Sequence, residues 1–402
     1  MRRQDFKVTS PGRLVPAGGV HAFVPDPLPR QLQLAGSTAR LMSRANHRIG
    51  ELSGISRPLK NPYLLGSALL RREAILSNRI EGTITNSEQL VLFEAGARLD
   101  DDDSSAGEVL NYVKAMRHGI KMLPKLPVSL RLIQELHDIV LKGVRGQREL
   151  PGHFREDQNW IGRPGSSIQE ARYVPPPVAD MRRGLNDLEK YLHLEPHSGS
   201  EGWEDFEEQA DLAPLLVRLA LIHYQFEAIH PFRDGNGRVG RLLIPLLLVS
   251  HGRLRAPLLY LSAYLERHRT EYYDHLLTVS QQGAWTEWID FFLRGVIESA
   301  TEAISQADTL IHLREDWRGR FEKARSSALL HKLIDSLFER PAITIGSAER
   351  LLKVTTASAS KNIKKLLSEG IVEERTGRKR DQIFVAMDIV RLMDEVRKEP
   401  RP

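Results

Sequence analysis

The sequence contains no cysteine, so disulfide bonds, thiolate nucleophiles and thiolate metal ligands are all excluded. Long apolar runs are also missing. The longest, "LLIPLLLV" from Leu242 to Val249, is far shorter than the roughly 20 residues of a membrane span. The first residues lack the apolar stretch of an export signal. We therefore expect a cytoplasmic protein that has no membrane partner.

Aromatic residues are few, at 6% of the chain, whereas 41% of residues are hydrophobic and 27% are charged. This composition is typical of a globular protein, and 402 residues suffice for two or three domains. The net charge of +5 is unevenly distributed. Residues 320–402 hold 18 Lys and Arg against 12 Asp and Glu, whereas the preceding residues hold 39 against 40. A nucleic-acid partner is therefore indicated for the tail alone.

The spacing of apolar residues predicts a mainly α protein. The first 60 residues, rich in Pro, Gly and Arg, indicate an extended arm. Residues 99–108 and 193–207 indicate loops, and the Gly- and Pro-rich stretch 152–177 indicates a short β-hairpin. Helices are expected from Tyr63 to a break at Gly82, and over Val109–Met122, Ser129–Gly143, Asp211–His230, Arg238–Ser250, Glu266–Val279 and Trp285–Ile311.

The stretch "HPFRDGNGRVGR", His230 to Arg241, combines residue types that folding alone rarely requires. Gly235 and Gly237 permit a tight turn just before the apolar helix, whose free N–H groups attract anions. Arg238 and Arg241 are three residues apart and so project from one face of its first turn. Two guanidinium groups at a helix N-terminus form a clamp for a polyphosphate.

The other polar residues of the stretch complete a site for nucleotide chemistry. Asp234 suits a magnesium ion that bridges phosphates, Asn236 can donate to a phosphate oxygen, and His230 can deprotonate a hydroxyl group. No G-K-[ST] follows the glycines, which excludes a P-loop. Three alternatives remain: an ordinary Gly-Asn-Gly turn, two solvated arginines, and a metal site formed by His223, Glu227 and His230.

As a whole, the stretch resembles the signature of Fic-domain proteins, H-x-F-x-[DE]-G-N-G-R-x-x-R, at all eight defined positions. The resemblance covers most of residues 60–300 and implies a Fic-type helical core with a small β-hairpin flap. It also implies protein adenylylation, in which AMP passes from ATP to a Ser, Thr or Tyr hydroxyl of a protein, including the enzyme itself, and pyrophosphate is released. The implied cofactors are ATP and Mg²⁺.

The resemblance also assigns roles to single residues. His230 is the implied general base, Phe232 anchors the loop, Asp234 holds Mg²⁺, and the flap over Ile168–Pro177 holds the protein substrate by adding a strand to it. A relative with lysine at the position of Gly237 acts as a kinase, so glycine favours AMP transfer. The implied ATP-binding residues are Glu81, Asp234, Gly235, Asn236, Gly237, Arg238, Val239, Gly240, Arg241, Tyr272 and Tyr273. For the two tyrosines, helix packing is the alternative.

Upstream, "SNRIEG" resembles the inhibitory motif of Fic proteins, [ST]-x-x-x-E-[GN], with Ser77, Glu81 and Gly82 in place. A carboxylate at Glu81 can form a bidentate pair with Arg241, which is then kept from the γ-phosphate. The resemblance therefore implies an N-terminal inhibitory helix. The alternative is an ordinary surface glutamate.

The tail resembles a winged helix-turn-helix. Helices are expected at about 328–338, 346–352 and 356–368, followed by a basic turn, Arg378–Arg380, between two strand-like stretches. In that resemblance the third helix enters a DNA major groove and the turn touches the backbone. Candidate contacts are Ser358, Ser360, Lys361, Lys364 and Lys365. A protein-interaction module of the same shape is the alternative.

Three regions are therefore expected: an N-terminal arm and inhibitory helix over residues 1–105, a Fic core over 106–315 and a winged helix over 325–395. Two other functions remain open: removal of AMP from a modified protein, and DNA-binding regulation with the core as a nucleotide sensor. A homodimer is also compatible with the sequence.

Overall fold

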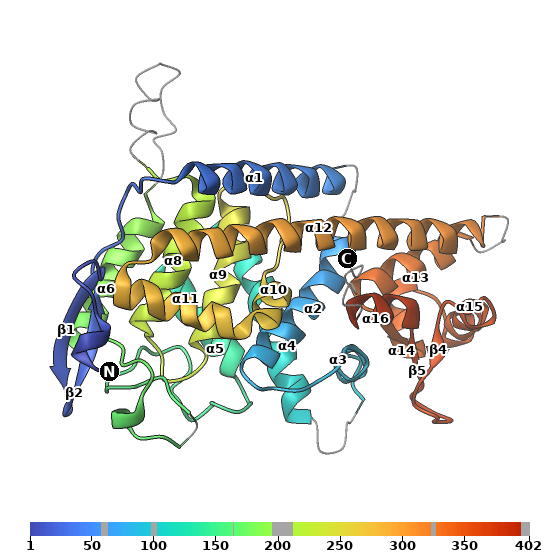
Figure 1. Cartoon of the computed structure of the whole chain (residues 1–402). Helices are drawn as coiled ribbons and strands as arrows, with labels where there is room; N and C mark the ends of the chain where they lie inside the picture. Colours follow the sequence, from blue (N-terminus) through green and yellow to red (C-terminus); the bar gives the residue numbers. More distant parts are fainter. Residues whose placement is uncertain (58–62, 98–102, 164, 195–211, 323–326, 395–402) are drawn as a thin grey trace. The chain divides into compact units, whose positions relative to one another are not determined.

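The computed structural model describes residues 1–57, 63–97, 103–163, 165–194, 212–322 and 327–394. Most of these residues are helical (Figure 1). They fall into two compact units. Unit 1 comprises Met1–Arg48, Lys114–His251 and Tyr264–Glu298, and unit 2 comprises Ile49–Val113, Gly252–Ala263 and Ser299–Pro402. None of the helices in the described ranges is both long and apolar enough to cross a membrane.

Unit 1 holds the first strands and the helices around the His230–Arg241 stretch. Its elements are η1 (Arg3–Asp5), β1 (Gly12–Ala17), β2 (Val20–Pro25), α5 (Leu130–Leu141), η2 (Ile168–Glu170), α6 (Val178–Leu192), α8 (Leu215–Ile229), α9 (Asn236–Ser250) and α11 (Arg269–Gln282). Four further helices have residues in both units: α1 (Gly36–Ser56), α4 (Asp103–Met122), α10 (Ser262–Arg267) and α12 (Trp285–Gly319).

The prediction of an extended N-terminal arm was wrong. Strands β1 and β2 pair antiparallel, from Gly12 opposite Pro25 to Ala17 opposite Val20, and helix α1 follows. Gly18 and Gly19 form the turn with positive φ angles of 59° and 84°, a conformation that glycine adopts readily and that suits a two-residue hairpin. The Gly-Gly pair is a signal for this turn, but in a segment rich in Pro and Gly it was not recognised as one.

The core of unit 1 forms where α9 packs against α8 and α5. Helix α9 is apolar nearly all round, and its residues from Leu242 to Leu248 are all buried, as predicted for Arg238–Ser250. The prediction for Ser129–Gly143 is confirmed by α5, which begins after its cap Ser129. Two helices are longer than predicted: α12 continues to Gly319, and α4 begins at Asp103 inside the expected acidic loop, where an acidic residue favours a helix N-terminus.

Unit 2 combines the predicted inhibitory helix with the end of the chain. Its elements are α2 (Tyr63–Ile80), α3 (Ser87–Glu94), α13 (Ser327–Glu339), β3 (Ala342–Thr344), α14 (Ile345–Leu352), α15 (Thr356–Ser368), β4 (Glu373–Glu374), β5 (Ile383–Val385) and α16 (Met387–Asp394). Helix α2 ends just before Gly82, which has a φ of 87°, as predicted.

The C-terminal module, residues 327–394, contains the three predicted helices as α13, α14 and α15. Strands β4 and β5 lie in the predicted strand-like stretches, and β3 joins them in an antiparallel sheet of order β3-β5-β4. Helix α14 packs against α15. Strand β3 and helix α16 were not anticipated. The interpretation as a winged helix stays a prediction, and so do the three domain boundaries.

Candidate functional site

The loop that carries the motif lies between the end of α8 and the start of α9. His230 caps α8 in a left-handed conformation, with a φ of 49°, and its N–H donates to Phe226 O at 3.0 Å. Gly235, with a φ of 79°, then precedes α9. The positive φ favours glycine, and a Cβ at this position would in addition lie 3.3 Å from the ring of His137.

The geometry of His230 indicates which ring nitrogen carries the proton. Its Nδ1 lies 3.3 Å from the carbonyl oxygen of Glu227. A carbonyl oxygen only accepts, so Nδ1 carries the proton, and the lone pair of the neutral ring is on Nε2. The side chain is half-buried at the end of the helix. This arrangement suits a general base.

Phe232 holds the loop in the core of unit 1. Its side chain is fully buried. The ring lies parallel to that of His137, with centroids 3.7 Å apart, and contacts the ring of Phe154 at 5.1 Å. Burial of this ring among other aromatic side chains holds the backbone of the loop in place, which agrees with the predicted anchoring role of Phe232.

Asn236 closes the loop on itself. Its Oδ1 accepts from Phe232 N at 2.9 Å, and its Nδ2 donates to Phe232 O at 2.8 Å. Asn159 donates to the same carbonyl oxygen at 3.0 Å. The side chain of Asn236 is only 2% exposed. The structure thus gives it a bracing role, and its contact with a phosphate stays a prediction.

Both motif arginines are buried rather than solvated. Arg238 is 1% exposed and Arg241 is 2% exposed, although charged side chains are rarely buried without a structural or functional reason. Val239 and Gly240 are buried with them, and Gly237 alone keeps partial exposure in this first turn. A Cβ on Gly240 would lie 2.4 Å from Glu227 Oε1, so this glycine lets α8 and α9 approach each other.

Asp234 fits the magnesium role. Its side chain is 42% exposed, and its Oδ1 accepts from Gly235 N at 2.6 Å and from Arg238 Nη2 at 3.3 Å. Gly146 leaves room beside the other oxygen, since a Cβ there would lie 2.7 Å from Asp234 Oδ2. Mg²⁺ is commonly held by one or two carboxylates together with substrate phosphates and water.

The alternative metal site around His223 receives no support. His223 Nδ1 lies 3.2 Å from Gly240 O, and its Nε2 lies 2.8 Å from the hydroxyl oxygen of Tyr272. Burial, followed by the charge of Arg241, lowers the pKa of His223 to about 3, so the ring is neutral. In the described part of the chain, no group of three His, Asp or Glu residues could hold a metal ion.

The two tyrosines proposed for adenine have different surroundings. Tyr272 is 1% exposed and packs among His223, Trp288 and Tyr273. Helix packing, the alternative interpretation, describes this residue. Tyr273 is half-buried, with the guanidinium carbon of Arg269 at 5.9 Å from its ring centroid. Contact of either ring with adenine stays a prediction.

Arg155 is a site residue that the sequence did not reveal. It is 1% exposed, and it donates through Nε to His230 O at 3.0 Å, through Nη1 to Asp157 O at 2.8 Å and through Nη2 to Pro176 O at 2.5 Å. Its own N–H donates to Pro231 O at 2.9 Å. Burial lowers its pKa to about 10, which leaves it charged at neutral pH. Arg155 thus joins the motif loop to the end of the flap.

The flap itself is less regular than the predicted hairpin. One antiparallel bridge pairs Ile161 with Tyr173, and η2 lies between them. The Tyr173 hydroxyl donates to Ala228 O at 2.9 Å, which fixes the base of the flap to α8. Most of the flap between the bridged residues is exposed or half-buried.

The predicted inhibitory residues lie at the end of α2, in unit 2. Ser77 is fully buried, whereas Glu81 is half-buried and Gly82 is exposed. Glu81 N donates to Asn78 O at 3.0 Å, and Thr83 Oγ1 donates to Glu108 Oε2 at 2.7 Å. These contacts give the turn that presents Glu81 a defined conformation.

Two family models match the chain in succession. The "Fic/DOC family N-terminal" model matches residues 39–121, and the "Fic/DOC family" model matches residues 127–248. Among curated proteins, "Protein adenylyltransferase Fic" of Drosophila virilis is 29% identical over 215 residues, and that of Drosophila melanogaster is 27% identical over 215 residues. The match covers 53% of this chain but only 38% and 37% of those proteins.

Solved structures show the same fold. A Fic family protein from Desulfovibrio desulfuricans G20 superposes with a TM-score of 0.55 at 19% identity, over 89% of this chain and 98% of that one. A Fic domain containing signaling protein from Bacteroides thetaiotaomicron VPI-5482 gives a TM-score of 0.50 at 18% identity, over 68% of this chain and 97% of the other.

Proposed function

The chain belongs to the Fic/DOC family, and we propose that it is a protein adenylyltransferase that transfers AMP from ATP to a hydroxyl group of a protein side chain. One observation carries this proposal. The complete motif is present, and its histidine is held by the Glu227 carbonyl oxygen in the tautomer that leaves Nε2 basic. A protein that only senses nucleotide needs no base at this position.

In the proposed reaction, His230 Nε2 takes the proton of the target hydroxyl as its oxygen forms a bond to the α-phosphorus of ATP. The bond from that phosphorus to the bridging oxygen breaks, and pyrophosphate leaves. Arg238 and Arg241 bind the phosphates, together with the N–H groups of the first turn of α9. Asp234 would hold Mg²⁺, which neutralises phosphate charge when bound. Tyr273 is the better candidate for the adenine contact, because Tyr272 is buried.

The proposal includes autoinhibition by Glu81. Its support is the inhibitory motif and the position of Glu81 in the turn after α2, where the side chain is half-buried rather than in the core. A carboxylate that pairs with Arg241 competes with the γ-phosphate for one guanidinium group, so ATP binds in an unproductive pose. The reverse reaction, in which Glu81 helps water to remove AMP from a modified protein, uses the same residues.

The protein substrate is proposed to add a strand to the flap near Ile168–Pro177. Residues 167–172 beside the bridge are exposed or half-buried, and this accessibility, together with the attachment of Pro176 to Arg155, supports the choice. Incubation with ATP and Mg²⁺, followed by intact-mass and peptide analysis of the protein and a lysate, tests the reaction. An added AMP on a hydroxyl side chain is expected. An added phosphate would contradict AMP transfer, and loss of AMP from a modified protein would favour the reverse reaction.

A second function, duplex DNA binding, is proposed for the C-terminal module. Lys361 and Lys364 on α15 are exposed, and so are Arg378, Lys379 and Arg380 in the turn before β5. None of these five cations forms an ion pair with any other residue in the described ranges. Unpaired cations on one helix and one turn suit phosphate contacts. A gel-shift titration with duplex DNA at several salt concentrations tests this function. A DNA affinity that does not change with salt concentration, or the absence of a complex, would favour a protein partner.

A further inference from the structure

The C-terminal module packs directly on the inhibitory segment, which we define as residues 63–94. Helix α2 contacts both α13 and α16, and α3 contacts α16 and β5. The module and the segment belong to one compact unit. The proposed DNA-binding end of the chain therefore shares a packed interface with the helix that leads into Glu81.

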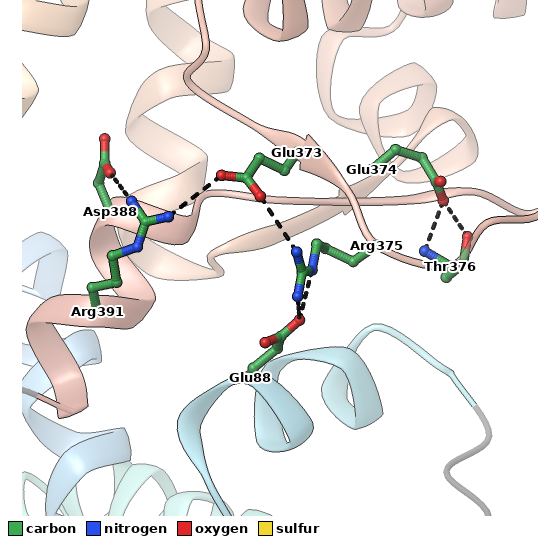
Figure 2. A network of polar contacts seen from close by, with 7 residues as sticks. All are labelled: Glu88, Glu373, Glu374, Arg375, Thr376, Asp388 and Arg391. Carbon is green, nitrogen blue, oxygen red and sulfur yellow. Dashed lines mark hydrogen bonds and ion pairs between the residues drawn. The ribbon is translucent and has the colours of Figure 1, made fainter.

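Two polar contacts fasten α3 to the module (Figure 2 shows the second). The fully buried Ser87 donates through Oγ to Asp394 Oδ1 at 2.6 Å. Arg375 reaches Glu88 Oε1 with both Nε and Nη2 at 2.6 Å. Arg375 also lies 3.4 Å from Glu373. The N-terminal turn of α3 is thus held by one buried hydrogen bond and one solvent-accessible ion pair.

The other end of α3 is fastened to α2. The fully buried Arg71 donates through Nε to Glu94 Oε2 at 2.8 Å. Glu81 lies in the turn between α2 and α3. A change in the position of α3 therefore affects α2, before this turn, as well as the residues after it. The Arg375–Glu88 pair is the solvent-accessible member of these contacts, with 37% and 29% of the two side chains exposed.

Arg375 lies three residues before the basic turn, Arg378–Arg380. Glu374 accepts from the N–H groups of Thr376 at 2.8 Å and Gly377 at 3.0 Å, which fixes the backbone there. Arg378, Lys379 and Arg380 follow directly and are exposed. A polyanion bound at this turn lies close in sequence to a guanidinium group that is already engaged by a carboxylate.

We propose that duplex DNA at the basic turn competes with Glu88 for Arg375 and thereby loosens the inhibitory segment. The inference rests on the proposed DNA binding and, for its functional meaning, on the proposed brake. In this arrangement DNA binding to the C-terminal module regulates the enzyme, and AMP transfer rises when DNA is bound. Because coupling is reciprocal, loss of the Glu88 carboxylate must strengthen DNA binding.

The expected size of the effect follows from the exposure of the pair. Ion pairs with this much exposure contribute little, so the coupling should be about two- to fivefold. The Ser87–Asp394 hydrogen bond and the packing of α3 against α16 and β5 remain when the ion pair opens. We therefore expect a local opening of the inhibitory segment rather than its unfolding.

The experiment uses the full chain and a mixed-sequence DNA duplex of about two helical turns. Its affinity is measured by fluorescence anisotropy for the wild type, Glu88→Gln and the control Asp388→Asn. Asp388 pairs with Arg391 at 3.0 Å in the same network, so both variants remove one negative charge from one ion pair (Figure 2). Glu88→Gln should bind the duplex about two- to fivefold more tightly than Asp388→Asn does.

Hydrogen exchange provides the second readout. Adding the duplex should speed exchange of amides in residues 85–94 about two- to fivefold in the wild type, whereas Arg375→Gln should exchange faster from the start and not respond. No duplex binding, equal affinities of the two charge variants, or unchanged exchange on binding would each overturn the proposal. Neither readout involves ATP. Their outcome therefore does not depend on whether the proposed AMP transfer is correct, and failure of one proposal can be distinguished from failure of the other.

Discussion

The rings of His137 and Phe232 lie face to face, with centroids 3.7 Å apart and planes 7° from parallel. His137 Nδ1 accepts from Gly152 N at 2.9 Å, so Nε2 carries the proton and donates to Asp234 O at 2.9 Å. Burial is the main reason that the pKa of His137 falls to about 4. A neutral histidine thus holds both the motif phenylalanine and the backbone of the proposed magnesium ligand.

We expect acid to destabilise the fold through this residue. The pKa is about 4 in the folded state against 6.5 in the unfolded state, so between these values the unfolded chain binds the additional proton. The stability contribution is therefore complete above pH 6.5 and is lost as pH falls toward 4. Lowering the pH from 7 to 5 should cost about 2 kcal/mol from His137 alone, measured by urea unfolding.

The variant His137→Asn provides the control for that pH dependence. An amide can donate to Asp234 O and accept from Gly152 N without titrating. Its unfolding free energy should therefore fall less steeply than that of the wild type between pH 7 and 5. Identical slopes would show that His137 is not the titrating group.

Replacement of the base should separate chemistry from binding. His230→Ala is expected to lower AMP transfer by about 10²–10⁴-fold, because a general base acts on the rate, and to leave ATP affinity nearly unchanged. Single-turnover labelling measures the first quantity and calorimetry the second. If ATP affinity falls together with AMP transfer, His230 has a structural role and its assignment as the general base is contradicted.

Arg155 should prove essential to the shape of the site. Arg155→Met removes the guanidinium donor of the carbonyl oxygens of His230, Asp157 and Pro176. The bond to Pro176 is buried, and a buried acceptor that loses its donor costs about 1–3 kcal/mol. We expect a loss of about 1–3 kcal/mol in chemical unfolding, together with weaker AMP transfer.

The matched control is Arg233→Met. Arg233 pairs with Asp157 at 2.6 Å, but its side chain is 33% exposed and that of Asp157 is 56% exposed. Its loss should cost less than about 1 kcal/mol. Equal destabilisation by the two variants would contradict the positioning role of Arg155.

Removal of the proposed brake should activate the enzyme. Glu81→Gly is expected to raise modification of the protein itself and of its target well above wild type, because Arg241 regains the γ-phosphate. Ser77→Ala should activate more mildly, since Ser77 is buried and would act only by positioning the helix. Labelling with radioactive ATP measures all three proteins.

The specificity of that release is tested at its partner. Arg241→Glu should be inactive with or without Glu81→Gly, so the double variant shows no gain. Activation of the double variant would indicate a general loosening of the helix instead. A Glu81→Gly protein with unchanged fold and ATP affinity but no added activity would remove the brake from the proposal.

The DNA prediction is best tested with point variants. Truncation near residue 320 would strip α13 and α16 from α2 and disturb the inhibitory segment. Lys361→Ala with Lys364→Ala should instead weaken duplex binding and lower the salt slope by about 2. Lys121→Ala with Lys125→Ala, which removes the same charge from an exposed part of unit 1, is the control. Equal weakening by both pairs would mean that the effect is general electrostatics.

The sequence by itself predicted the elements and the motifs that depend on local pattern. Helix α9, the capped start of α5 and the three tail helices follow from apolar spacing and capping residues. The motif and the inhibitory hexapeptide are contiguous, so their residue types and spacing could be recognised directly. The N-terminal hairpin was missed, although its Gly-Gly turn was a local signal.

Only the tertiary structure decided which distant groups complete the site. Arg155 and His137 hold the loop through bonds to carbonyl oxygens that lie about 75 and 97 positions away in sequence, and no periodicity encodes such pairs. The packing of residues 63–94 against the C-terminal module is likewise a contact between segments that lie far apart in the sequence. Backbone oxygens are present at every position, so their partners are chosen by packing geometry and burial rather than by residue type.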